Sequence, residues 1–100
     1  MVYFGLTAKA GKIAFGTESC EDLIVKKKLK LVIVAEDSSE RTINNFKEKC
    51  EKNNIDFYIF GKKEDISKSI GKVNKTVIGI KDKNLAGAIK KILNGGDVIG

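Results

Sequence analysis

The residue types that most often carry out catalysis are scarce in this chain of 100 residues. There is no histidine, so the commonest general base and metal ligand is missing. The two cysteines, Cys20 and Cys50, are far apart in the sequence, and such a pair does not make a zinc site. We therefore expect no enzyme activity, no metal and no cofactor.

Three adjacent acidic pairs are the remaining candidates for acid–base catalysis. They are Glu21-Asp22, Glu36-Asp37 and Glu64-Asp65. Each pair lies in or beside the start of a predicted helix, where carboxylates stabilise the positive end of the helix dipole. This structural role is far commoner than catalysis, and we favour it.

Residues 11–17, with the sequence GKIAFGT, partly match the phosphate loop of nucleotide triphosphatases, G-x-x-x-x-G-K-[ST]. The lysine that this loop requires is missing, because Thr17 directly follows Gly16. What remains is a strand, a glycine and a helix start that carries Thr17 and Ser19. Backbone N–H groups at such a start can bind a phosphate group, although an ordinary turn with a helix cap explains the same residues.

The net charge of +6 is concentrated in the second part of the chain. Residues 60–100 hold nine lysines against four acids, a net of +5. This asymmetry indicates an anionic partner, although a lysine-rich surface that serves solubility explains it equally well. Arg41 is the only arginine, so we expect point-charge contacts to phosphate rather than the forked contacts that read bases.

The hydrophobic pattern predicts short strands at residues 12–15, 31–35, 57–60 and 76–80. The continuous apolar run at 31–35 is typical of a strand that is covered on both sides. Helices are expected between the strands and at both ends of the set, which makes five helices and four strands. This alternation predicts an α/β fold, a three-layer α-β-α sandwich around a mixed, mostly four-stranded sheet.

Capping residues and inward-facing side chains give approximate bounds for the helices. Residues 3–10 form the first helix, Thr17 caps the second, and Asp37 with Glu40 forms a capping box for the third. The fourth runs from Ile66 to Ile70, and Asp82 caps the last. The inward-facing residues of the second, third and last helices are Cys20, Leu23 and Ile24; Ile43, Phe46 and Cys50; and Leu85, Ile89, Ile92 and Leu93.

Residues 1–94 are expected to form one domain, followed by a flexible tail at 95–100. No apolar run approaches the roughly 20 residues that span a bilayer, and we see no secretory signal. Cys20 and Cys50 are expected to be buried, reduced thiols, which fits the cytoplasm.

Several segments, in the same order, resemble the L-seven-Ae and L-thirty-e family of ribosomal proteins in a bacterial form. The segments are 6–12 (LTAKAGK), 16–18 (GTE), 30–39 (KLVIVAEDSS), 57–62, 66–71 and 77–82. The resemblance implies an α-β-α sandwich that binds structured RNA, typically a kink-turn. A kink-turn is a sharply bent helical element with tandem G·A pairs.

The resemblance also implies two groups of RNA-binding residues. In the family, the loop and helix start after the first strand enter the RNA groove, and a loop before the last strand packs beside a splayed nucleotide. The first group here is Gly16, Thr17, Glu18, Ser19 and Asp22. The second is Ile70, Gly71, Lys72 and Val73, with Asn74 and Lys75 as further members.

The chain departs from the family pattern at both groups. Many kink-turn binders carry G-x-N-E-x-x-K in the first group, whereas residues 16–22 here read GTESCED. Glu18, Ser19 and Asp22 thus replace the expected Asn, Glu and Lys. In the second group, residues 66–71 read ISKSIG instead of L-G-x-A-x-G. These exchanges do not affect the predicted fold, but they bear directly on kink-turn affinity.

Two functions remain open from the sequence. The first is a non-catalytic RNA-binding protein of the ribosome or of translation, a cytoplasmic monomer with structured, ribosomal RNA as its partner and no membrane contact. The second is a protein-interaction module on the same fold, with a ribosomal or other protein as its partner. The family resemblance and the basic second part of the chain support the first hypothesis, which we favour. The altered first group of residues supports the second.

Overall fold

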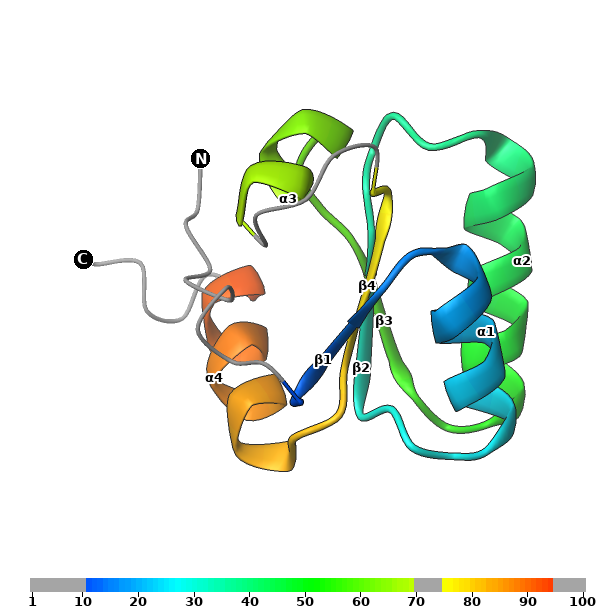
Figure 1. Ribbon diagram of the computed structural model, residues 1–100, viewed down its shortest axis with the longest axis vertical. Coiled ribbons are helices and arrows are strands. Elements are labelled where there is room, and N and C mark those ends of the chain that lie inside the picture. Colours follow the sequence, from blue (N-terminus) through cyan, green and yellow to red (C-terminus); the bar gives the residue numbers. More distant parts are fainter. Residues whose placement is uncertain (1–10, 70–74, 95–100) are drawn as a thin grey trace.

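The computed structural model describes residues 11–69 and 75–94, in which strands and helices alternate (Figure 1). The elements are β1 (Ile13–Phe15), α1 (Thr17–Val25), β2 (Leu31–Val34), α2 (Glu40–Lys52), β3 (Asp56–Ile59), α3 (Lys63–Ser69), β4 (Val77–Ile80) and α4 (Lys83–Leu93). All four strands and four of the five helices were predicted to within a few residues. The predicted first helix and the tail at 95–100 lie outside the described residues.

The four strands form one mixed sheet in the order β1-β4-β2-β3. Strand β4 is antiparallel to both of its neighbours, whereas β2 and β3 are parallel. In this register Ile80 lies opposite Ile13 on one side and opposite Leu31 on the other. Consequently β1, β4 and β2 are aligned at the end of the sheet where α1 ends and α4 begins.

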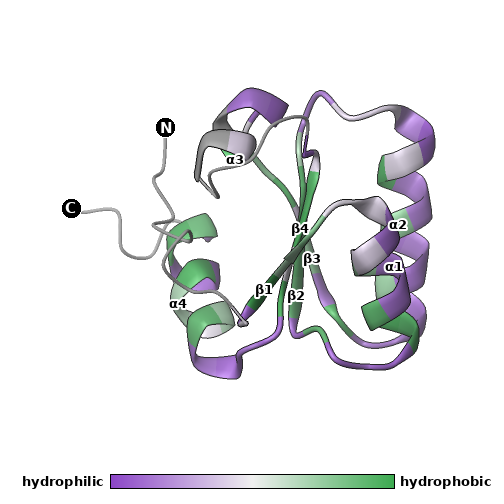
Figure 2. Cartoon of the chain, in the orientation of Figure 1, coloured by the Kyte–Doolittle hydropathy of each residue, from purple (hydrophilic) through white to green (hydrophobic). Residues whose placement is uncertain are grey.

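Helices cover both faces of the sheet, which confirms the three-layer sandwich (Figure 1). Helices α1 and α2 cover one face and pack Cys20, Ile24 and Phe46 against it. Helices α3 and α4 cover the other face with Ile66 and Ile89. Figure 2 shows hydrophobic strands between the two helical layers, and all four residues of β2 are fully buried, as its continuous apolar run predicted.

The predicted cap of α1 is wrong by one residue. Thr17 is the first helical residue, and the N-cap is Gly16, which has φ 98° and ψ 154°. No side chain caps this helix. The Gly16 N–H instead donates to Val77 O at 3.0 Å, and Gly16 O accepts from Cys20 N–H at 3.2 Å. Because the glycine backbone makes the turn itself, the Thr17 hydroxyl is left exposed.

The predicted capping box of α2 is also wrong. Its N-cap is Ser39, whose hydroxyl accepts from Thr42 N–H at 3.1 Å. Asp37 instead accepts from the N–H of Lys63, the first residue of α3, at 2.8 Å. The acidic residue therefore supports a helix start, as expected, but the start of the next helix. The predicted cap of α4 is confirmed, since Asp82 accepts from Leu85 N–H at 2.8 Å.

The inner face of α4 differs slightly from the prediction. Ile89 is buried, and Leu85 and Leu93 pack against the same core. Ala86 is also buried, although its small side chain was not singled out. Ile92 is only half-buried and lines a surface hollow together with Lys91, because it lies toward the edge of the apolar stripe.

Cys20 and Cys50 are fully buried, which confirms that both face inward. Burial raises the pKa of each thiol to about 12, and the charge of Cys50 adds a smaller effect at Cys20. Both groups are therefore protonated at neutral pH, and the protonated thiol is a poor nucleophile and metal ligand. Within the described residues, no helix is long and apolar enough to cross a membrane.

Candidate functional site

The turn at Gly16 joins the two groups of predicted site residues. The φ and ψ angles of Gly16 fall in a region that is essentially restricted to glycine. Its hydrogen bond to Val77 O ties the end of β1 to the start of β4. The first turn of α1 and the segment that leads into β4 therefore meet at one end of the sheet, which we call the loop end.

Lys75 is the described member of the second predicted group, and it lies against the first. A Cβ atom on Gly16 would lie 3.6 Å from Lys75 Nζ. The Lys75 backbone is held by the buried hydroxyl of Ser67, which accepts from Lys75 N–H at 2.9 Å and donates to Lys75 O at 3.1 Å. The structure thus brings the Lys75 ammonium group to the Gly16 turn, whereas residues 70–74 lie outside the described residues.

The first turn of α1 presents polar groups beside this ammonium group. Thr17, Glu18 and Ser19 are all exposed. The first N–H groups of a helix have no partner within the helix and point out of its N-terminal end. Here that end faces the Gly16 turn, so N–H groups, two hydroxyls and the Lys75 cation are available to an anion. The Glu18 carboxylate opposes the binding of an anion at the same place.

Asp22 lies further along α1, away from the Gly16 turn. Its carboxylate pairs with Lys26, one turn further on, at 3.1 Å, and both side chains are more than half exposed. Exposed pairs of this kind contribute little to stability. The pairing directs the Asp22 charge toward the C-terminal end of α1. The structure therefore places Asp22 apart from the other four residues of its predicted group.

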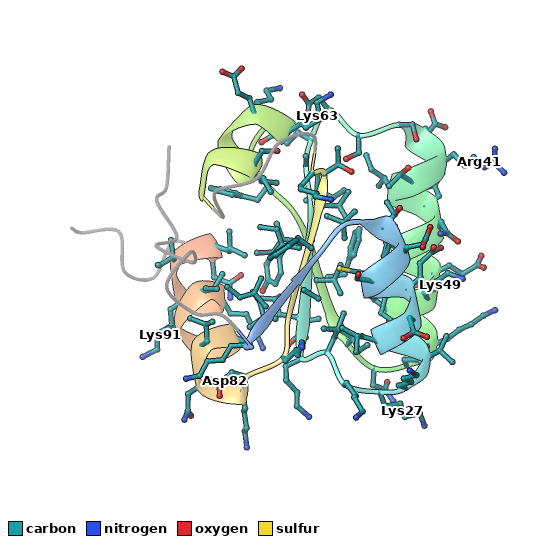
Figure 3. The ribbon with its side chains drawn as sticks, viewed as in Figure 1. Lys27, Arg41, Lys49, Lys63, Asp82 and Lys91 are labelled. Carbon is teal, nitrogen blue, oxygen red and sulfur yellow. The ribbon has the colours of Figure 1, made fainter. Side chains whose placement is uncertain are left out.

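A hollow of about 450 Å³ lies between α1 and α2 and begins at Thr17. Its lining residues are Thr17, Glu21, Arg41, Thr42, Asn45 and Phe46. Glu21 accepts from Asn45 Nδ2 at 2.8 Å, which fixes one side of the hollow. Arg41 is exposed at its rim and is labelled in Figure 3.

Sequence reasoning missed this hollow as part of the site. Arg41 was noted only as the lone arginine, and Glu21 only as an acid near a helix start. The two helices that form the hollow are separated by β2, so no local spacing places Arg41 beside Thr17. The only signal for the hollow in the sequence was that both helices have apolar faces. Both helices therefore had to pack on the sheet, where they could lie side by side.

Within residues 11–69 and 75–94, no cluster of three or more histidine, cysteine or acidic side chains could hold a metal ion. The site as described offers hydrogen-bond donors, hydroxyls and two nearby cations. These groups bind anions and polar edges. The molecule is thus a small α/β/α sandwich whose loop end is suited to a phosphate-bearing ligand.

This fold belongs to a known family. The chain is a member of the Ribosomal protein L7Ae/L30e/S12e/Gadd45 family, whose model matches residues 3–89. The resemblance inferred from the ordered segments is thereby confirmed.

Two bacterial relatives are similar to the chain over nearly its whole length. One is the RNA-binding protein YlxQ of Enterococcus faecium, which is 34% identical over 95 residues, covering 95% of this chain and 91% of that protein. The other is the RNA-binding protein YlxQ of Bacillus subtilis, which is 28% identical over 94 residues and covers 90% of each chain.

Solved structures share the fold. A protein of unknown function from Bacillus halodurans matches with a TM-score of 0.85 and 25% identity, over 92% of this chain and 93% of that one. The 15.5kD RNA binding protein of Giardia lamblia matches with a TM-score of 0.77 and 18% identity, over 98% of this chain and 84% of that one. At that identity the second match shows the fold alone.

Proposed function

We propose that this protein is a non-catalytic protein that binds structured RNA at its loop end. The observation that carries the proposal is the position of Lys75 Nζ beside Gly16, which puts a cation next to the N-terminal N–H groups of α1. Phosphate groups bind at helix N-termini because the N–H groups and the helix dipole both favour negative charge. The two relatives named as RNA-binding proteins support this choice of ligand.

The chemistry of the loop end favours contacts to the RNA backbone over base reading. Glu18 and Ser19 take the places of the amide and carboxylate side chains of the family pattern. The hydroxyls of Thr17 and Ser19 and the N–H groups at the Gly16 turn are then the polar groups that can contact the RNA backbone. Lys75 contributes a point charge to phosphate. Arg41 is the one side chain near the site with the planar fork that can bind two acceptors of a base or phosphate at once.

The RNA that we propose is a kink-turn or a related bent element, as in the family resemblance. Ile70, Gly71, Lys72 and Val73 then pack beside the splayed nucleotide, with Asn74 and Lys75 completing that loop. Association with the ribosome or with translation, a cytoplasmic location and a monomeric state belong to the same proposal. The shared membership of a ribosomal protein family supports it.

A binding assay with two RNAs tests the proposal. One RNA is a kink-turn, and the other is the same hairpin with its tandem G·A pairs replaced by Watson–Crick pairs. We expect tighter binding to the kink-turn, and affinity that falls as salt rises, because each phosphate that is neutralised releases counterions. Lys75→Gln should weaken binding, whereas Lys91→Gln on α4 is a charge-matched control that should not.

The proposed site would be contradicted if the wild type bound the two RNAs with equal affinity and Lys75→Gln left that affinity unchanged. Binding with a flat salt dependence would contradict the phosphate contacts. Complete absence of RNA binding would favour the second candidate function, a protein-interaction module. That alternative is favoured by Glu21, which lines the hollow, and by the exposed Glu18 on the same helix, because both carboxylates suit a basic partner surface.

A further inference from the structure

Lysines flank three neighbouring strands at the end of the sheet opposite to the loop end. Lys12 precedes β1, Lys81 follows β4, and Lys30 precedes β2. These three strands are adjacent in the sheet. We call the three residues the lysine row, and this end of the sheet the lysine end.

The strand register brings the three lysines close together. Ile80 lies opposite Ile13, and the bond from Lys81 N–H to Lys12 O at 2.7 Å extends this ladder to Lys12 and Lys81. Lys30 lies at a bend just before β2, and its N–H donates to Ile80 O at 2.7 Å, which holds it beside the end of β4. Since neighbouring strands are ~4.8 Å apart, the three side chains start within about 10 Å of one another.

The alternation of side chains places two of the three lysines on one side of the sheet. Ile13 and Ile80 belong to the core under α3 and α4. Lys12 and Lys81 extend the β1–β4 ladder by one pair and therefore start on the opposite side, the side that α1 covers. Lys30 lies at a bend that follows Leu29, a residue of the core under α1 and α2. There the loop from α1 to β2 adds Lys27 and Lys28, both exposed. Figure 3 shows Lys27 at this end of the molecule.

Three carboxylates on elements that reach the lysine end have partners of their own. Asp22 pairs with Lys26 at 3.1 Å, and Asp82 caps α4. Asp56 pairs with Lys90 at 2.6 Å, and this hydrogen bond raises the pKa of Lys90. Like charges directly opposite one another are destabilising, so the pair of Lys12 and Lys81, with Lys30 beside it, opposes folding in the free protein. An anion bound at the row would relieve that repulsion.

We infer that the lysine row is a second phosphate-binding surface, which binds the backbone of an RNA segment that flanks the segment held at the loop end. The inference rests on the proposed function. Lysines give point-charge contacts that hold phosphates without reading bases. At ~3.3 Å per residue along β1, Lys12 lies only about 13 Å from Gly16, so one RNA molecule can reach both ends of the sheet.

The test compares a short RNA with a long one. The short RNA is the bent element alone, and the long RNA carries the same element with each arm extended by one helical turn. The protein variants are the triple variant Lys12→Gln/Lys30→Gln/Lys81→Gln and a charge-matched control, Lys47→Gln/Lys49→Gln/Lys91→Gln. Affinities are measured for the full chain over a range of salt concentrations.

We expect the triple variant to bind the long RNA about tenfold or more weakly than the wild type. Its log–log salt slope should be flatter by up to about 0.9 for each phosphate that the row no longer neutralises. Binding to the short RNA should be the same for both proteins. The control variant should lose less affinity for the long RNA than the triple variant. Without RNA, the triple variant should unfold at a higher temperature than the wild type, because the repulsion is removed.

Equal affinity of wild type and triple variant for the long RNA overturns the inference while leaving the proposed function intact. The inference is also overturned if the control variant loses as much affinity for the long RNA as the triple variant does, because the loss then reflects total charge. If the triple variant loses binding only to an acidic peptide or to anionic vesicles, the row serves another partner and the inference is wrong. If the wild type binds neither RNA, the proposed function fails and the inference fails with it.

Discussion

The two ends of the central sheet differ in how they are prepared for an anion. At the loop end the backbone is held in place and acids lie among the cations: Gly16 is held by its bond to Val77 and Lys75 by Ser67, Glu18 lies in the first turn of α1, and Lys62 pairs with Glu36 at 3.5 Å. At the lysine end the cations are neighbours: Lys12, Lys30 and Lys81 flank adjacent strands, and Lys27 and Lys28 lie in the loop before β2. A rigid frame selects a ligand by shape, whereas long lysine side chains attract any phosphate backbone.

This difference indicates a division between selectivity and affinity. Exchanging backbone geometry at the loop end should change which RNA is bound. Changing the charge at the lysine end should change the affinity for any long RNA and the salt dependence of that affinity. Each of the following predictions tests one side of this comparison.

The largest effect is expected for Gly16→Ala. The backbone angles of Gly16 are strained for any residue with a Cβ, so the variant should be less stable by roughly 1–3 kcal/mol. The bond to Val77 should weaken as the turn shifts, and selectivity for the bent RNA should fall. Urea unfolding measures the first effect and competition between bent and straight RNA the second.

Gly87→Ala is the matched control for that variant. Gly87 lies in α4, where an added Cβ meets no atom within 4 Å. Alanine is favoured over glycine inside a helix, so this variant should gain about 0.5–1 kcal/mol of stability and keep wild-type RNA binding. Wild-type stability for Gly16→Ala would show that the turn tolerates a side chain and is not a rigid frame.

A loss of stability of about the same size, but confined to the segment that leads into β4, is expected for Ser67→Ala. The buried hydroxyl bonds both the N–H and the C=O of Lys75, and its removal leaves those two groups without this partner. We expect a loss of about 1–3 kcal/mol of stability and faster amide exchange at Lys75 than in the wild type. Amide exchange at Ile33, at the centre of the sheet, should become faster only as much as the loss of global stability predicts. Unchanged exchange at Lys75 would mean that Ser67 does not hold the cation in place.

The sequence predicted the elements of this molecule better than their ends. The run 31–35 identified the buried strand because five consecutive apolar residues suit only a fully covered position. Asp37 was misassigned because its partner, Lys63, is 26 residues away and only the folded chain brings them together. Similarly, Thr17 was predicted as the N-cap of α1, but the N-cap is Gly16. The Gly16 backbone is held there by its hydrogen bond to Val77, which forms only when the sheet is assembled.

The candidate site was predictable only in part, for the same reason. The resemblance gave Gly16 and Lys75 as members of two separate groups, and the fold placed them together. The lysine row depends on strand order and register, which the pattern of a single sequence does not contain. Charge counting placed most of the excess after residue 59, yet two of the three row lysines, Lys12 and Lys30, come before it.

The smallest effect is expected for Asp22→Lys, and it separates local from total charge. The exchange restores the lysine of the family pattern and should tighten binding to a kink-turn by about 1 kcal/mol, or roughly fivefold, through a charge-assisted phosphate contact. The variant loses only an exposed pair with Lys26, so its stability should change by less than about 1 kcal/mol. Glu48→Lys is the matched control, because Glu48 forms the same kind of exposed pair with Lys52 on α2 and the change in net charge is identical. If both variants tighten binding equally, attraction by total charge explains the gain, and the RNA makes no particular phosphate contact at residue 22. If Asp22→Lys alone tightens it, the bound RNA passes along α1 from the Gly16 turn toward the lysine end.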